Sequence, residues 1–162
     1  MKGDAMEKLG QYHRMATVIC YGMIGTLLVF AAMVETLKAT NYGWPGNVFS
    51  YSVLELLRYV FLGVAILEFF VIKVMRRAIL SWGGRISGLP NRGDPLSTKV
   101  QRLFTAAIVT FAFCESVGIY GLVLFLIGGS SFDFYLFLFL SLVFFALYFP
   151  RYSQWEEWAK SN

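Results

Sequence analysis

Four long apolar runs constrain this sequence more than any other feature. They cover residues 15–37, 53–75, 103–127 and 132–149. About 20 apolar residues cross the hydrocarbon core of a bilayer as an α-helix. Each run is continuous rather than alternating, which favours helices over the strands of a barrel. The sequence therefore predicts an all-α fold, an integral membrane bundle of four transmembrane helices.

The composition agrees with this interpretation. Hydrophobic residues make up 57% of the 162 residues and charged residues 15%, whereas soluble domains have about 25% charged residues. A soluble core of this size cannot hide so much apolar surface. Lipid is therefore the expected neighbour of the remaining apolar side chains.

The distribution of Lys and Arg predicts the orientation. The segment between the second and third runs, about residues 76–102, is rich in basic residues, and so are the two ends of the chain. The loop after the first run has only Lys38, and the turn after the third run has no basic residue. Basic segments stay on the cytoplasmic side. We therefore expect one membrane domain, residues 1–162, in a bacterial-type inner (cytoplasmic) membrane, with both termini and the central loop in the cytoplasm.

Tryptophan placement gives a separate indication. All four tryptophans lie outside the apolar runs: Trp44, Trp82, Trp155 and Trp158. Aromatic residues of this kind gather at the interface between membrane and water. The sequence therefore predicts that they form an interfacial belt.

Glu115 is the most informative ionisable residue, because it falls near the middle of the third run. It follows Arg102 by 13 residues, or roughly 20 Å of helix. An ionised carboxylate at that depth costs about 2.5–3.5 kcal/mol or more, so desolvation favours the protonated form. Two interpretations stay open: a group for proton transfer or an ion path, and a neutral glutamic acid that hydrogen-bonds between helices.

The eight residues Glu115-Ser-Val-Gly-Ile-Tyr-Gly-Leu122 resemble the second helix of the proteolipid, or c, subunit of rotary ATP synthases. In that family a carboxylate in mid-membrane is followed by a Gly/Ala-Ile-Tyr-Gly-Leu run and binds the translocated proton or sodium ion. The resemblance implies that Glu115 is the ion-binding position and that Tyr120 is its packing or hydrogen-bonding partner.

The second run carries more charge than the others. Glu55 and Arg58 are three residues apart and are predicted to pair on one face of a helix. Glu68 precedes Lys73 by five residues and Arg76 by a little over two helical turns, so its charge is expected to be met near the cytoplasmic surface. The alternative is that Arg58, Glu68 and Glu115 line one polar path, which requires the second and third runs to face each other.

Several classes of function lack their motifs. The chain has one histidine, His13, so a haem held by two histidines of one chain is excluded and a histidine metal site is not expected. No Walker A, GxSxG or HExxH motif is present. The sequence predicts no cofactor and no metal, and the clustered basic residues indicate membrane orientation rather than nucleic-acid binding.

Three functions remain. The leading one is a proton- or ion-linked membrane protein that uses Glu115, with Tyr120 and Glu68 in support. The second is a structural or scaffolding subunit of a membrane complex. The third, a membrane-embedded lipid-modifying enzyme, would show a lateral polar pocket near Arg58 or Arg102. The expected partners are the lipid bilayer and either copies of this chain or other membrane subunits.

Overall fold

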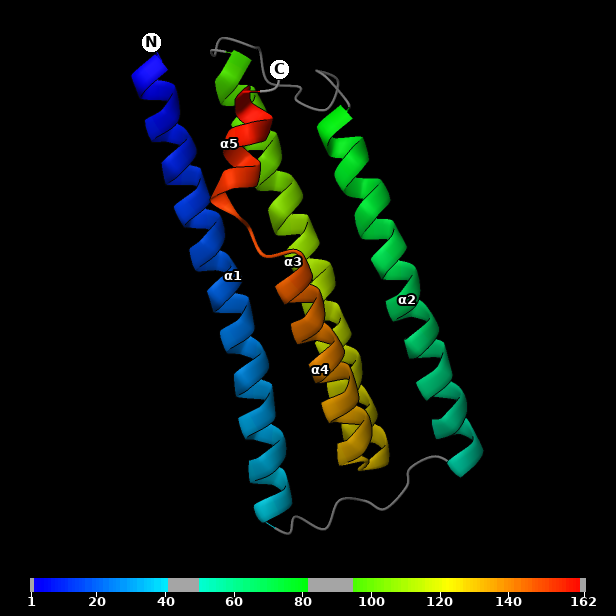
Figure 1. Ribbon diagram of the computed structural model, residues 1–162. Coiled ribbons are helices and arrows are strands. Elements are labelled where there is room, and N and C mark those ends of the chain that lie inside the picture. Colours follow the sequence, from blue (N-terminus) through cyan, green and yellow to red (C-terminus); the bar gives the residue numbers. More distant parts are fainter. Residues whose placement is uncertain (1, 41–49, 82–94, 161–162) are drawn as a thin grey trace.

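Five helices make up the described part of the computed structural model, which covers residues 2–40, 50–81 and 95–160 (Figure 1). The helices are α1 (Lys2–Ala39), α2 (Tyr51–Ser81), α3 (Pro95–Gly128), α4 (Ser131–Leu147) and α5 (Tyr152–Lys160). The predicted all-α class is confirmed, and each apolar run forms one helix. Helices α1, α2 and α3 extend well beyond their runs, and α5 lies in the tail, for which the sequence predicted no helix.

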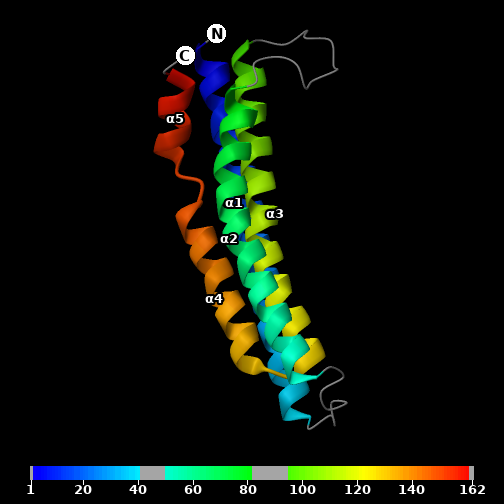
Figure 2. The ribbon, with the colours of Figure 1, turned by 90° about the vertical axis from the view of Figure 1, so that its right-hand side faces the viewer.

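Helix α3 is the centre of the bundle, because it contacts α1, α2, α4 and α5. Helices α1 to α4 lie side by side along their lengths, with α1 and α2 on opposite flanks of α3 (Figures 1 and 2). The first turns of α1 and α3 and the last turns of α2 and α5 share one end of the molecule (Figure 1). The turn from α3 to α4 lies at the other end.

The hairpin of α3 and α4 is tight because glycine and serine shape it. Gly129 has φ +68°, a left-handed conformation that glycine adopts without a steric penalty. The side chain of Ser130 caps α4 by accepting a hydrogen bond from the backbone N–H of Asp133 at 3.4 Å. A Cβ atom on Gly121 would lie 2.9 Å from the carbonyl oxygen of Phe134. Only glycine therefore permits this approach of α4 to α3.

Two buried clusters hold the helices together. The larger one joins α1, α2, α3 and α4 along the length of the bundle. The smaller one, at the end where the chain begins, consists of five residues: Leu9, Ala16, Val100, Leu103 and Trp155. It is formed where α5 folds back against α1 and α3.

Trp155 packs inside the protein, whereas the predicted interfacial tryptophan belt, which stays a prediction, would place such side chains against lipid. Its side chain is only 3% exposed, since α5 packs it into the smaller cluster. Beside it, the Nε2 atom of His13 lies 3.0 Å from the carbonyl oxygen of Pro150 and joins α1 to the segment before α5. Trp44 and Trp82, and the side chain of Trp158, lie outside the described residues.

Large apolar side chains cover the outer surface of the bundle. Val18 of α1, Leu56 and Phe70 of α2 and Phe139 of α4 are each at least 60% exposed. Two stretches, Leu9–Ala39 and Val100–Gly128, are long and apolar enough to cross a membrane, and α4 is a shorter apolar helix.

Helix α2 is long enough to cross a membrane but is less apolar than these two stretches. Four ionisable residues fall along it: Glu55, Arg58, Glu68 and Lys73. The described residues thus contain two candidate spans. The bundle of four crossings stays a prediction.

Candidate functional site

Glu68 lies at the contact between α2 and α3 and is only 6% exposed. Its Oε1 atom accepts two hydrogen bonds from α3: one from the Tyr120 hydroxyl at 2.6 Å and one from the Ser116 hydroxyl at 3.0 Å. The ring of Phe61 stacks on the Tyr120 ring, with 5.1 Å between centroids. The structure therefore brings together two of the predicted residues, Glu68 and Tyr120, and adds Ser116, which the sequence analysis did not select.

The second oxygen of Glu68 is different. Oε2 is buried, and within the described residues it has no hydrogen-bond partner. Lys73, which was expected to meet this charge, holds its Nζ atom 4.3 Å from the centroid of the Phe69 ring instead. Glu68 is therefore buried in the bundle and held by hydroxyl groups rather than by lysine at the surface.

Glu115 lies on a different face of α3. It adjoins Ser116, so the two side chains leave the helix about 100° apart and their Cα atoms differ in depth by about 1.5 Å. Glu115 shares its face with Ala112 and Ile119, which are exposed, and is itself partly exposed. No hydrogen bond or ion pair holds its carboxyl group in the described part of the chain. Glu68 of α2 packs against one face of α3, and Glu115 lies on another face of α3 at a similar level along the bundle.

This arrangement separates residues that the resemblance had placed together. Tyr120 was expected to be the partner of Glu115, but its hydroxyl donates to Glu68. Helices α2 and α3 do face each other, as a shared polar path would require. Glu115 nevertheless turns to another side of α3, and Arg58 is engaged elsewhere.

Arg58 forms an ion pair with Asp133 of α4. Its Nε atom lies 2.6 Å from Oδ1, and its Nη2 atom donates to Oδ2 at 2.8 Å. The Asp133 side chain is 8% exposed and that of Arg58 is 36% exposed. Glu55, the predicted partner of Arg58, is exposed on α2.

The sequence analysis did not identify Asp133. One signal was available, because Ser130 and Asp133 have the spacing of a capping serine and an acidic residue in the first turn of a helix. The same turn is also tied to α1, since the Tyr135 hydroxyl donates to the carboxylate of Glu35. The start of α4 therefore connects both α1 and α2.

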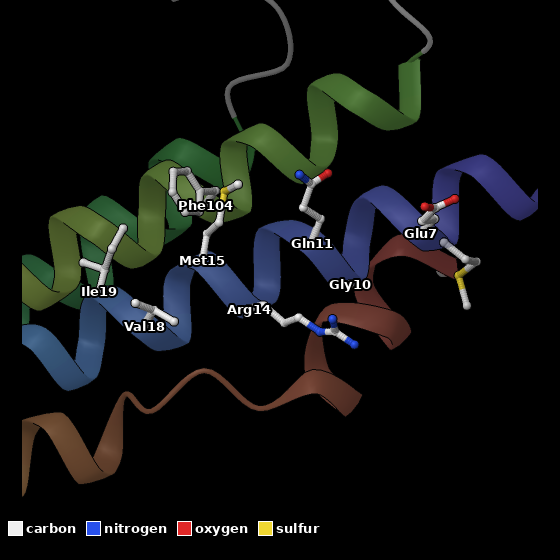
Figure 3. A pocket seen from close by; sticks show the side chains of 9 residues that line it. Glu7, Gly10, Gln11, Arg14, Met15, Val18, Ile19 and Phe104 are labelled. Carbon is white, nitrogen blue, oxygen red and sulfur yellow. The ribbon is translucent and has the colours of Figure 1, made fainter.

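A separate groove of about 870 Å³ lies along the first half of α1. Figure 3 shows that its lining side chains come from α1, apart from Phe104, which comes from α3. Glu7, Gln11 and Arg14 contribute its polar atoms. An enzyme pocket was expected near Arg58 or Arg102, and one lining residue of this groove, Phe104, is two residues from Arg102. None of the described lining residues is a serine, cysteine or histidine nucleophile.

Comparison with known proteins gives a partial match. Residues 93–127 match the family model of the ATP synthase c subunit. These 35 of the 162 residues correspond to almost all of α3 and include Glu115, Ser116 and Tyr120. No curated protein and no solved structure matches the chain. The match confirms the predicted resemblance, which is a similarity of one helical segment to the ATP synthase c subunit rather than of the whole chain.

Proposed function

We propose that this chain is a polytopic membrane protein whose function is linked to a proton or another small cation through Glu115. The observation that carries the proposal is the position of this carboxyl group. It stands partly exposed on the outward side of the central helix, with no partner in the described residues, inside the segment similar to the ATP synthase c subunit. Ionisable groups at such depth are rare in membrane helices and are usually functional.

The proposal includes four crossings of a bacterial-type inner membrane, with both termini in the cytoplasm. Two observations support this topology. The described ends of α1, α2, α3 and α5 that adjoin the basic segments share one end of the molecule (Figure 1). Large apolar side chains also cover the outer faces of α1, α2 and α4, as lipid contact requires.

The exposure of Glu115 further implies that the chain works in an assembly. A carboxyl group that faces outward from a bundle meets either lipid or another subunit, and lipid cannot stabilise its ionised form. We therefore include a second subunit, either a copy of this chain or another membrane protein, as the neighbour of Glu115.

The test is proton flux in liposomes that contain the purified protein. Glu115→Gln keeps the size of the side chain but removes its ionisable group, so flux should fall to the level of empty liposomes. Glu55→Gln is the matched control, because Glu55 is exposed on α2 outside the proposed site. Carbodiimide should also label Glu115 of the wild-type protein in a pH-dependent way. Unchanged flux in Glu115→Gln, with helix content preserved, would rule out the proposal.

A scaffolding subunit is the second candidate. It is favoured by the use of other polar groups as ties between helices, such as Arg58 with Asp133 and Tyr120 with Glu68. In that case Glu115→Gln should leave function intact, and purification in mild detergent should recover a defined membrane partner. An isolated monomer without a partner would count against this candidate.

A further inference from the structure

The groove along the first half of α1 has no role in the proposed function. Its volume of about 870 Å³ falls within the range of about 300–1,000 Å³ that is usual for ligand sites. Its walls come from α1 and from Phe104 of α3 (Figure 3). A cavity of this size can hold the headgroup of a lipid and the first part of its acyl chains.

The lining of the groove changes from polar to apolar along α1. Glu7, Gln11 and Arg14 line the part nearer the start of the helix. Arg14 is the last residue before the first apolar run, and Val18 and Phe104 line the groove on the apolar side. In the proposed topology, polar headgroups meet acyl chains at this level of the cytoplasmic leaflet. The groove therefore has the polarity of an amphiphile that lies parallel to α1.

Two opposite charges line the groove in a fixed order. Arg14 and Glu7 are both exposed, and in the described part of the chain no hydrogen bond or ion pair engages either side chain. They are seven residues apart, or two helical turns and about 10 Å along one face. The Arg14 side chain extends toward Gly10, between these turns (Figure 3), as long side chains on helices usually do. The positive charge thus lies next to the apolar part of the groove, and the negative charge lies farther from it.

Phosphatidylethanolamine carries its charges in the matching order. Its phosphate adjoins the glycerol and the acyl chains, and its primary ammonium group lies at the tip of the headgroup. A guanidinium group binds phosphate oxygens through paired hydrogen bonds, and a primary ammonium group donates hydrogen bonds to a carboxylate. Phosphatidylglycerol has no ammonium group, and the ammonium group of phosphatidylcholine has no N–H to donate. Charge complementarity with Arg14 and Glu7 therefore selects phosphatidylethanolamine among these lipids.

The apolar part of the groove is formed by side chains that can support an acyl chain. The Tyr12 ring packs edge to face against Phe104, with 5.5 Å between centroids, and both side chains pack against the smaller cluster. Past the groove, Val18 is 70% exposed and Val29 is 64% exposed, on nearly the same face of α1. Gly22 lies between them, with open space where a side chain would be. An acyl chain can follow this path toward the middle of the bilayer.

We propose that the groove binds one molecule of phosphatidylethanolamine from the cytoplasmic leaflet. The phosphate binds Arg14, the ammonium group binds Glu7, and an acyl chain lies against Phe104 and Val18. The lipid site rests on the membrane topology of the proposed function, but not on any role of Glu115 in ion transfer.

Gly10→Leu blocks the groove without disturbing the packing of the helices. A Cβ atom at Gly10 would meet nothing within 4 Å, and leucine favours a helix more than glycine does. The new side chain therefore occupies the groove between Arg14 and Glu7. Gly63→Leu is the matched control, because Gly63 is exposed on α2, also has open space and lies outside the groove.

The experiment is native mass spectrometry of the full chain, released from nanodiscs that contain equal amounts of phosphatidylethanolamine, phosphatidylglycerol and phosphatidylcholine. The wild type and Gly63→Leu should retain phosphatidylethanolamine in excess over the other two lipids, and Gly10→Leu should retain no excess. Arg14→Gln should lower the retained phosphatidylethanolamine about fivefold, the effect of losing an exposed ion pair.

Glu7→Gln tests the order of the charges. This variant keeps Arg14 and the shape of the groove but removes the carboxylate that binds the ammonium group. It should lose the preference for phosphatidylethanolamine over phosphatidylglycerol, because Arg14 still binds the phosphate of either lipid. A groove that collects any phospholipid would give the same ratio of the two lipids in Glu7→Gln and in the wild type, and that result would overturn the proposal.

The proposal is also overturned if the wild type retains the three lipids equally, or if Gly10→Leu retains as much phosphatidylethanolamine as Gly63→Leu. A change from oligomer to monomer in Gly10→Leu, with lipid retention unchanged, would instead place a second copy of the chain in the groove. Flotation with liposomes separates these outcomes from the proposed function. A wild-type protein that does not float contradicts both proposals, whereas one that floats without a lipid preference contradicts the lipid site alone.

Discussion

Replacing Arg58 by leucine should destabilise the bundle more than replacing Asp133 by leucine, although both substitutions break the same ion pair. Arg58→Leu leaves a carboxylate that is 8% exposed without its cation. Removing one partner of a buried pair costs about 3–5 kcal/mol. Asp133 also lies in the first turn of α4, where the helix dipole offsets up to about 1 kcal/mol. We therefore expect a loss of about 2–4 kcal/mol in the free energy of unfolding.

Asp133→Leu has a smaller expected cost. It leaves Arg58, whose side chain is 36% exposed and can turn its guanidinium to the surroundings, so solvent offsets part of the lost contact. About 1–2 kcal/mol is expected for the lost charged hydrogen bonds. The double variant removes both charges together and should lie within about 1 kcal/mol of the wild type. The double-mutant cycle should therefore show a coupling of about 4–5 kcal/mol.

The assay is reversible unfolding by sodium dodecyl sulfate from mild detergent micelles, followed by far-ultraviolet circular dichroism. Lys38→Leu is the control, because Lys38 pairs with Glu35 at an exposed position and its removal should leave the free energy of unfolding unchanged within the precision of the assay. Equal costs for the two single variants, or additive costs in the double variant, would refute the idea that asymmetric burial sets the cost.

The remaining predictions use the same unfolding assay. Gly121→Ala should lower the free energy of unfolding by about 1–3 kcal/mol, because the new methyl group meets the backbone of α4. The control Gly22→Ala has open space around the new methyl group and should be neutral or slightly stabilising. Equal effects of the two substitutions would contradict the close approach of α4 to α3 at Gly121. Tyr120→Phe should cost about 1–2 kcal/mol through its buried hydrogen bond, against about zero for Tyr59→Phe at an exposed position. Trp155→Ala should cost about 3–5 kcal/mol and should release α5, seen as faster tryptic cleavage in the C-terminal tail; unchanged cleavage would argue against docking of α5.

The helices could be predicted from the sequence because each one contains a continuous apolar run, which is a local property of the chain. The third run predicted α3 within a few residues at its C-terminal end, and Glu115 was noticeable because it interrupts that run. The limits of α1 and α2 were harder to place. Both helices continue through polar residues, where hydropathy changes but helical backbone geometry does not.

The contacts between helices were harder to predict from the sequence. Glu55 and Arg58 are neighbours by sequence spacing, yet Arg58 reaches Asp133, 75 residues away. Glu68 was expected to meet Lys73 on the same helix, but the packing of α2 on α3 brings it to Tyr120 and Ser116. A rule based on helical spacing describes one helix at a time. The partner across an interface depends on which faces meet.

The central position of α3 has a consequence for biogenesis. Helices α1 and α2 are made first but lie on opposite flanks of a helix that has not yet been synthesised. In the membrane topology proposed above, the inner faces of α1 and α2 would have no helix to pack against until α3 emerges. Until then, the carboxyl group of Glu68 also lacks its two hydrogen-bond donors on α3, the hydroxyl groups of Tyr120 and Ser116. If that topology holds, a chain interrupted before residue 95 is expected to be degraded earlier than the full chain.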